Sequence, residues 1–476
     1  MVDELSIETE EPLASGHATP DSLRQWLADL ASLRQLAQAL FGDVAWLSFK
    51  NGETIHAHKF ILYARAPGQS HYGRICSEKQ AQLILPTASG AFLHRYIEDA
   101  PRAAEPVRAH QGFEVRDLES VDFDELAEDE RIDVGILEAA LDWFYTAERE
   151  AEAFAVLLAG FKDGGDDATS VKAALAGWRR LQRDLMYCWR SQLYADATIV
   201  VECAPGTPFA VHRAVLAART PYFGALLTGE YSDSNCTTFA LPSPPFTPAA
   251  TTFVLGWMYG GSLQSIERRF DLDTACGIWR CAAFLAADSL QKEVEEQLLA
   301  MMSSTRAARI LAFARAVDVR SEELAAKAME FLVERFDSSW TASPHVGQLS
   351  YADQSALVQR VGDRVTAGNL IATSLRLAAC RRALPHHSTP WVEHVRAMLE
   401  AVEDSFVAVL KADLAHVVRT SAFLHLIDGV GFNNDVLEWL LSLVIKSLDE
   451  EGAPRAYQVL LTDVLYREVR PRPLLT

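Results

Sequence analysis

The sequence predicts an α+β protein in which two related units, each a small sheet with helices, precede an α-helical array. An internal repeat predicts the two units, because similar stretches recur in the same order along the chain. Short segments of strand-like residues flank each copy of the repeat and predict its sheet. Beyond the repeat, apolar residues recur at helical spacing to the end of the chain, and this spacing predicts the array.

The repeat is clearest where a strand is expected to lead into a helix. The second copy reads HRAVLAARTPYF from His212, and the first reads HKFILYARAP from His58. When the two histidines are aligned, the copies share His, Leu, Ala, Arg and Pro at the same offsets. We therefore interpret the two stretches as equivalent junctions in two domains of one fold.

Similar elements are expected around each junction. In the first copy they are a strand, an Asn-Gly turn, a return strand and a helix, over residues 43–49, 51–52, 54–57 and 58–64. In the second copy they are a strand, a turn, a return strand and two helices, over residues 196–201, 204–207, 209–211, 212–219 and 222–227. A strand at 237–241 and a helix through 253–259 follow in the second copy.

The late part of the repeat shows that the first copy carries an insertion. Residues 141–145 read LDWFY and echo LGWMY at 255–259, but these two stretches lie closer together than the two histidines do. The extra residues fall most naturally within 88–133, which holds two prolines and an acidic run. A long surface insertion costs little loop entropy, so the first copy can keep its fold.

The remaining segments set the expected boundaries. Residues 1–19 are acidic and without periodicity, which predicts a disordered tail. A helix with a broad apolar stripe begins at Pro20, and that stripe needs a partner surface within the chain or on a second copy. Between the copies we expect a helix over 148–161, a flexible break over 163–167 and a longer helix over 171–194.

The C-terminal part predicts only helices. Their expected ranges are 273–288, 290–302, 305–318, 321–336, 350–362, 369–384, 390–410, 412–428, 434–449 and 454–468. Start signals at Thr389-Pro390, Ser350 and Asn434-Asp435 support three of them.

Composition excludes several classes of function. The net charge is −20, from 44 basic and 64 acidic residues, and it repels phosphate backbones. We therefore expect no binding to nucleic acid or to anionic membranes. The 7 cysteines are scattered without a CxxC pair, which indicates reduced thiols. With no signal peptide and no apolar run long enough to span a bilayer, we expect a soluble protein of the cytoplasm, the nucleus or both.

Motifs for catalysis are missing from the sequence. We find no GxGxxG, P-loop, GxSxG or HExxH pattern, and we expect no enzymatic activity and no cofactor. The repeated His58 and His212 are candidate bases, but their place at a strand-to-helix junction favours a structural role. His56-x-His58 and the group of His386, His387 and His394 lack a carboxylate or cysteine at the usual offset, so we predict no metal site.

These features together resemble the BTB/POZ domain. The second copy carries the resemblance through HRAVLAARTPYF and FTPAATTFVLGWMYGGSL, and the first through DVAWLSF, AHKFILYARAP and LEAALDWFYTAE. The order of domains is then a tail (1–19), a first BTB/POZ domain with its insertion (20–150), a helical linker (151–193) and a second BTB/POZ domain (194–303). Helices over 304–370 resemble the BACK extension, and a C-terminal helical region (371–476) follows. Tandem copies of this kind are similar to fungal BTB proteins and to the inhibitor of Bruton's tyrosine kinase.

The resemblance implies an adaptor that recruits substrates to a cullin-3 ubiquitin ligase. Cullin-binding members have a hydrophobic-x-Glu motif at the place where this chain has Tyr231-x-Asp233, and the first copy has no counterpart. The resemblance therefore implies that the second copy contacts cullin-3 through Leu226, Leu227, Tyr231 and Asp233. Residues 88–133 or the C-terminal helices would then hold a protein substrate whose identity the sequence does not reveal.

The family's dimer interface includes a buried acid–base pair, which by resemblance corresponds to Asp43 with Lys59 and to Asp196 with Arg213. A homodimer is therefore one expectation, and pairing of the two copies within one chain is another. Lys59 lacks the planar fork of arginine, which makes the first pair the weaker candidate. An alternative function is a self-associating scaffold or transcription-linked protein that uses the BTB fold without binding a cullin.

Overall fold

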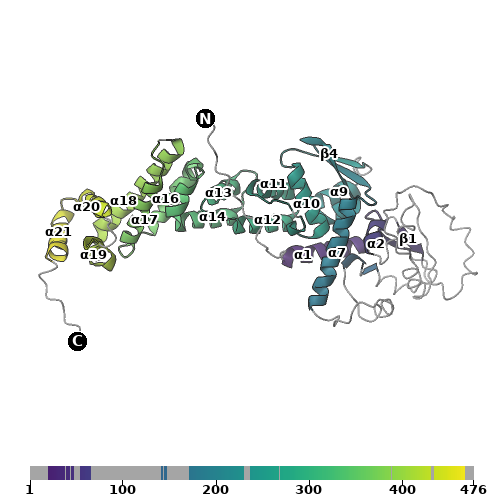
Figure 1. The fold of residues 1–476 in the computed structure, drawn as a ribbon, viewed down its shortest axis with the longest axis horizontal. Coiled ribbons are helices and arrows are strands. Elements are labelled where there is room, and N and C mark those ends of the chain that lie inside the picture. The colour runs from purple at the N-terminus through teal and green to yellow at the C-terminus, as the bar shows by residue number, and fades with distance from the viewer. Residues whose placement is uncertain are drawn as a thin grey trace, which may run out of the picture. The chain divides into compact units, whose positions relative to one another are not determined.

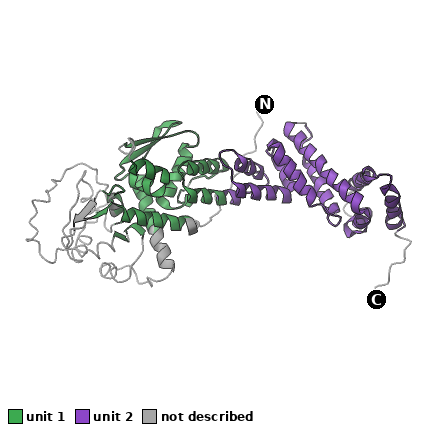
Figure 2. Cartoon of the chain, turned by 180° about the vertical axis from the view of Figure 1, so that it is seen from behind, with its two compact units in different colours: residues 1–296 green, residues 297–476 purple. Residues whose placement is uncertain are grey.

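The computed structural model divides the chain into two compact units, residues 1–296 and residues 297–476 (Figure 2). It describes residues 20–37, 39–42, 44–47, 54–65, 141–142, 144–146, 171–229, 236–266, 268–387, 389–429 and 434–466. The expected tail, the insertion at 88–133, the Asn-Gly turn and the helix at 148–161 lie outside these residues.

The larger sheet of the first unit, which includes the strand labelled β4 in Figure 1, has three strands in the order β4-β3-β5. Strand β3 (Ala197–Val201) pairs antiparallel with β4 (Ala204–Val211) and parallel with β5 (Thr238–Leu241). Alternate residues of β3 are buried, as the strand-like pattern predicts. The predicted turn at 204–207 is wrong: these residues begin β4, and the chain reverses at 202–203, next to a register shift between Ile199 and Val201.

Helices enclose the inner face of this sheet. The central one is α10 (Pro248–Gly260), which is buried over most of its length and ends at Gly261, whose φ of 72° suits glycine. Around it lie α8 (Arg213–Arg219), α9 (Pro221–Thr228), η5 (Leu263–Ser265), α11 (Leu272–Phe284) and α12 (Asp288–Ala300). The Thr220 side chain caps α9, and Pro221 occupies its first turn, so the HRAVLAARTPYF stretch forms two helices as predicted.

The N-terminal segments repeat part of this arrangement. They comprise α1 (Pro20–Gln35), the hairpin of β1 (Val44–Leu47) and β2 (Thr54–Ala57), and α2 (Lys59–Arg65). Helix α7 (Val171–Ser191) precedes β3 as α1 precedes β1. Val44 pairs with Ala57 in the hairpin, and Ala197 pairs with Val211 at the equivalent place of the larger sheet.

The second unit is helical throughout its described residues, as predicted. Its elements are α13 (Ala307–Arg315), α14 (Glu322–Glu334), α15 (Phe336–Ala342), η6 (Val346–Gln348), α16 (Tyr351–Asp363), α17 (Leu370–Ala383), α18 (Pro390–Arg419), α19 (Ser421–Ile427), α20 (Asn434–Ser447), α21 (Gly452–Val459) and η7 (Leu460–Leu465). The predicted break between the helices at 390–410 and 412–428 lies close to a kink inside α18, but the second of these predicted helices is itself divided at Thr420. Helix α18 continues to Arg419 with a kink at Asp413, and Thr420 then caps α19.

Candidate functional site

His212 anchors the junction between β4 and α8. Its backbone N–H donates to the hydroxyl of Tyr259 at 2.9 Å, and its Nδ1 lies 2.8 Å from the same hydroxyl. Its Nε2 lies 2.7 Å from the carbonyl oxygen of Leu193. A neutral ring protonated at Nε2 satisfies all three contacts. Burial lowers the pKa of His212, which favours that neutral form, and the prediction of a structural histidine is confirmed.

His58 makes the same contacts in the N-terminal segments. Its backbone N–H donates to the Tyr145 hydroxyl at 2.9 Å, its Nδ1 lies 2.6 Å from that hydroxyl, and its Nε2 lies 2.6 Å from the Leu40 carbonyl oxygen. Burial lowers the pKa of His58 to about 4. The repeat found in the sequence thus extends to a shared pattern of hydrogen bonds.

Acidification is expected to destabilise the first unit through His58. Its pKa is about 4 when folded and 6.5 otherwise, so the unfolded chain binds more protons between these values and stability falls as the pH falls. Between pH 7.5 and pH 5 this contributes a loss of about 2 kcal/mol. Burial raises the pKa values of Asp29 and Glu293, and these carboxyls oppose the loss.

The contribution of His58 to the pH dependence of stability can be separated from that of the two carboxyls by comparing wild type with His58→Asn. Hydrogen exchange in rising urea, read on peptides of the first unit at pH 7.5 and pH 5, measures that difference. We expect the variant to lose about 2 kcal/mol less than wild type over this range. Equal losses in both proteins would contradict the assignment.

The acid–base pair proposed for a dimer interface forms within the chain. Asp196 Oδ1 accepts from the backbone N–H of Arg213 at 2.8 Å, and Oδ2 accepts from its Nε at 3.1 Å. Both side chains are partly exposed, and the Arg213 guanidinium lies 4.5 Å from the centre of the Phe41 ring. The other proposed pair lies outside the described residues, because neither Asp43 nor the side chain of Lys59 is described.

The four residues proposed to contact cullin-3 differ in what the structure shows of them. Leu227 is buried and packs in the core of the first unit, whereas Leu226 is partly exposed. Tyr231 and Asp233 lie outside the described residues. The structure adds an aromatic contact that the sequence did not indicate, because the rings of Tyr222 and Phe284 lie 4.9 Å apart and Phe284 is exposed.

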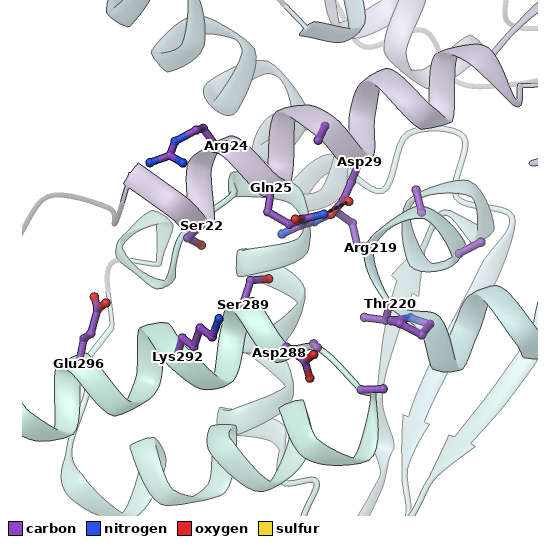
Figure 3. A pocket seen from close by; sticks show the side chains of 16 residues that line it. Ser22, Arg24, Gln25, Asp29, Arg219, Thr220, Asp288, Ser289, Lys292 and Glu296 are labelled. Carbon is purple, nitrogen blue, oxygen red and sulfur yellow. Dashed lines mark hydrogen bonds and ion pairs between the residues drawn. The ribbon is translucent and has the colours of Figure 1, made fainter. Parts of the chain in front are cut away.

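A cleft of about 970 Å³, lined by both polar and apolar groups, lies beside α9 (Figure 3). Helix α1 contributes Ser22, Gln25 and Asp29, and the start of α12 contributes Asp288 and Lys292. The junction between α8 and α9 forms the remaining wall. Acidic and basic side chains both line the cleft, so it lacks the single sign of charge that selects an anion or a cation.

Arg219 forms part of that wall and is itself buried. It donates to Asp29 of α1, and its guanidinium carbon lies 3.9 Å from the centre of the Trp257 ring. Burial lowers the pKa of Arg219 and raises the pKa of Asp29. The ion pair between the two residues opposes both shifts. This contact binds α1 to the rest of the first unit.

A buried carboxylate makes a second connection to α1. Glu293 accepts from the hydroxyls of Ser22 and Ser262, at 2.8 and 2.9 Å, and from the backbone N–H of Leu263 at 2.9 Å. Ser22 in turn accepts from the indole N–H of Trp257 at 3.2 Å. Groups of the same unit thus supply the hydrogen bonds that a buried carboxylate requires, and they connect α1 to α12.

Two further features of the described residues concern metal ligands and membrane-spanning helices. In the ranges that the structure describes, no group of three or more His, Cys, Asp or Glu side chains is arranged to hold a metal ion. His394 instead places Nδ1 2.7 Å from the Gly347 carbonyl oxygen. Of the helices described, none has both the length and the apolar character to cross a membrane.

Comparison with known proteins identifies one region of the chain, which lies mostly in the first unit. The family described as "BTB/POZ domain" matches residues 186–301. "TD and POZ domain-containing protein 4" of Mus musculus is 26% identical over 156 residues, which are 32% of this chain and 39% of the relative. "Kelch repeat and BTB domain-containing protein 12" of Danio rerio is 30% identical over 142 residues, or 29% of this chain and 21% of the relative.

A human relative matches to a similar extent. "Kelch repeat and BTB domain-containing protein 2" of Homo sapiens is 26% identical over 149 residues, which are 31% of this chain and 22% of the relative. The chain thus spans well under half the length of these relatives. The matched region begins in α7 and ends just after α12, so it holds the three-stranded sheet and its helices. Residues 186–301 of this chain are a BTB/POZ domain.

Proposed function

We propose that this protein is a non-enzymatic adaptor that joins two other proteins. The observation that carries the proposal is the BTB/POZ domain at 186–301, whose sheet and central helix are complete among the described residues. Two of the relatives are named for Kelch repeats joined to a BTB domain, which is the plan of a binding module beside a second module. The helical second unit provides that second module here.

The partner that we propose for the BTB domain is cullin-3. The resemblance predicts the contact after α9, through Tyr231 in an apolar pocket and Asp233 as a hydrogen-bond acceptor. Partly exposed Leu226 and the exposed ring of Phe284 support an apolar surface beside it. Buried Leu227 is better assigned to holding α9 in place than to contact with a partner. The protein substrate would bind to the helices of 304–370 and 371–476, the first of which resemble BACK helices.

Binding to cullin-3 is measured by titrating the full chain against the N-terminal region of cullin-3. We expect wild type to bind and Tyr231→Ala to lose about 1–3 kcal/mol, because truncation of an interface anchor usually has this effect. Tyr351 of the second unit is 86% exposed, so Tyr351→Ala is the matched control and should bind as wild type does. If wild type does not bind at micromolar concentrations, the cullin assignment is rejected.

A second candidate function is a scaffold that assembles through the BTB fold without a cullin. The partly exposed pair of Asp196 and Arg213 favours it, because such a pair can specify the geometry of an interface. We also propose that the N-terminal segments are a second, interrupted BTB-like copy. The shared hydrogen bonds of His58 and His212 and the matching strand registers support that proposal.

A further inference from the structure

We propose that the N-terminal segments and the BTB domain pair with each other inside one chain, about a pseudo-two-fold axis. The leading helix of each half contacts the other half: α1 packs on α8 of the BTB domain, and α7 packs both on α10 of its own half and on α2 of the N-terminal segments. The proposal rests on these reciprocal contacts and does not depend on binding to cullin-3. We call the surface of the BTB domain that contacts residues 20–65 its pairing face. In this proposal the partner of that face is a segment of the same chain.

The first line of support is a pair of equivalent ion pairs. Arg219 ends α8 and binds Asp29 of α1, while Arg65 ends α2 and binds Asp184 of α7, with Nη1 and Oδ2 2.8 Å apart. The two arginines are the shared Arg of the repeat, and both are buried. Each arginine therefore reaches across to the leading helix of the other half.

The two leading helices also bury three residues each at matching positions. Helix α1 buries Trp26, Leu30 and Leu33, and α7 buries Leu181, Leu185 and Cys188. The spacing within each set is identical, and the acidic partner of each arginine precedes the second member of its set by one residue. Helices α1 and α7 thus bury residues at matching positions and each pairs an aspartate with an arginine of the other half. We infer that they occupy equivalent places in the pair.

The two halves meet directly between the histidine junctions. The ring of Phe60, two residues after His58, stacks on the ring of His212 with centroids 4.2 Å apart. The thiol of Cys188 in α7 donates to the carbonyl oxygen of Phe60 at 3.3 Å. These contacts place the start of α2 against the start of α8, close to the axis of the pair.

Reciprocal contact is the property that defines an isologous interface, in which residue i of one half meets residue j of the other and j meets i. In an oligomer, the two sides of such an interface come from two separate chains. Here the connection between the halves holds both at high effective concentration, so the pairing face is covered in cis. A second chain consequently finds the places of α1 and α7 already taken.

A cut between the two halves tests the proposal on the full chain. A protease recognition site inserted between Gly164 and Gly165 allows cleavage of the folded protein. We expect the intact protein to have the mass of one chain by light scattering, and the two pieces to stay together after the cut at nanomolar concentration. Asp29→Ala and Asp184→Ala should each weaken retention about tenfold or more, because each removes a carboxylate that contacts a buried arginine of the other piece. Glu393→Gln removes an exposed pair in the second unit and should leave retention unchanged.

Two results would overturn the inference. The first is an intact protein with the mass of two chains that exchanges subunits between differently tagged copies, which would place the pairing in trans. The second is separation of the two pieces of the cut wild-type chain at micromolar concentration. Both results are independent of cullin-3, so failure of the adaptor proposal and failure of the internal pair are distinguishable.

Discussion

Trp26→Ala is expected to lower the free energy of unfolding of the first unit by about 3 kcal/mol, at the lower end of what large-to-small core substitutions cost. Trp26 is fully buried, and the Cβ of any residue replacing Gly261 would meet its ring at 2.7 Å. Its indole N–H has no hydrogen-bond partner among the described residues, so its removal relieves part of the cost. Helix α1 lies outside the matched BTB region. The loss of stability on Trp26→Ala therefore measures how much the packing of α1 contributes to the core of the first unit.

Hydrogen exchange in rising urea, read on peptides from β3 and α10, measures the effect within the first unit. Leu36→Ala is the matched control, because Leu36 follows α1 directly and is 54% exposed. We expect the control to change stability by less than about 0.5 kcal/mol. An equal, small effect of both substitutions would show that α1 is only loosely attached.

Asp29→Ala is expected to destabilise the first unit more than Arg219→Met, although Asp29 is the more exposed partner. Removal of Asp29 takes away the carboxylate that the buried guanidinium contacts, and loss of such a partner costs about 3–5 kcal/mol. Removal of Arg219 leaves a carboxylate at the wall of the cleft, where water and protonation relieve it, and methionine keeps much of the packing volume. We therefore expect a loss of about 1–3 kcal/mol for Arg219→Met.

The double variant makes the comparison sharper. Asp29→Ala with Arg219→Met should be more stable than Asp29→Ala alone, because it also removes the buried guanidinium that has lost its carboxylate. Urea denaturation read by the same peptides measures all three proteins. Simple additivity of the two single effects would contradict an ionic contact between these residues.

Local patterns predicted the helices well and their ends less well. The stripe and the start signal at Thr389-Pro390 predicted the start of α18, and the expected break between 410 and 412 lies close to its kink at Asp413, but the patterns missed the division at Thr420. Helix α15 was missed, because its seven residues bury only Phe336, Ser339 and Trp340 and show no stripe. The misplaced turn of β4 has a similar cause, since Pro205 and Gly206 are typical of turns and here lie in an exposed strand end.

The contacts of the candidate site depended more on tertiary packing. The repeat showed that Arg65 is equivalent to Arg219 and that His58 is equivalent to His212. Their partners Asp29 and Asp184 lie on helices outside the aligned stretch, and only the folded chain brings them within reach. The apolar stripe of α1 predicted a partner surface, but a stripe does not specify which surface covers it.

The mass of the complex with cullin-3 tests the account most directly. Sedimentation of the full chain with an excess of the N-terminal region of cullin-3 yields both the binding and the number of chains. In the proposed arrangement one BTB/POZ domain is available and residues of the same chain cover the surface through which it would pair, so we predict a complex of one chain with one cullin-3 fragment. A chain that sediments alone at micromolar concentration, or a complex built on two chains, would contradict the account.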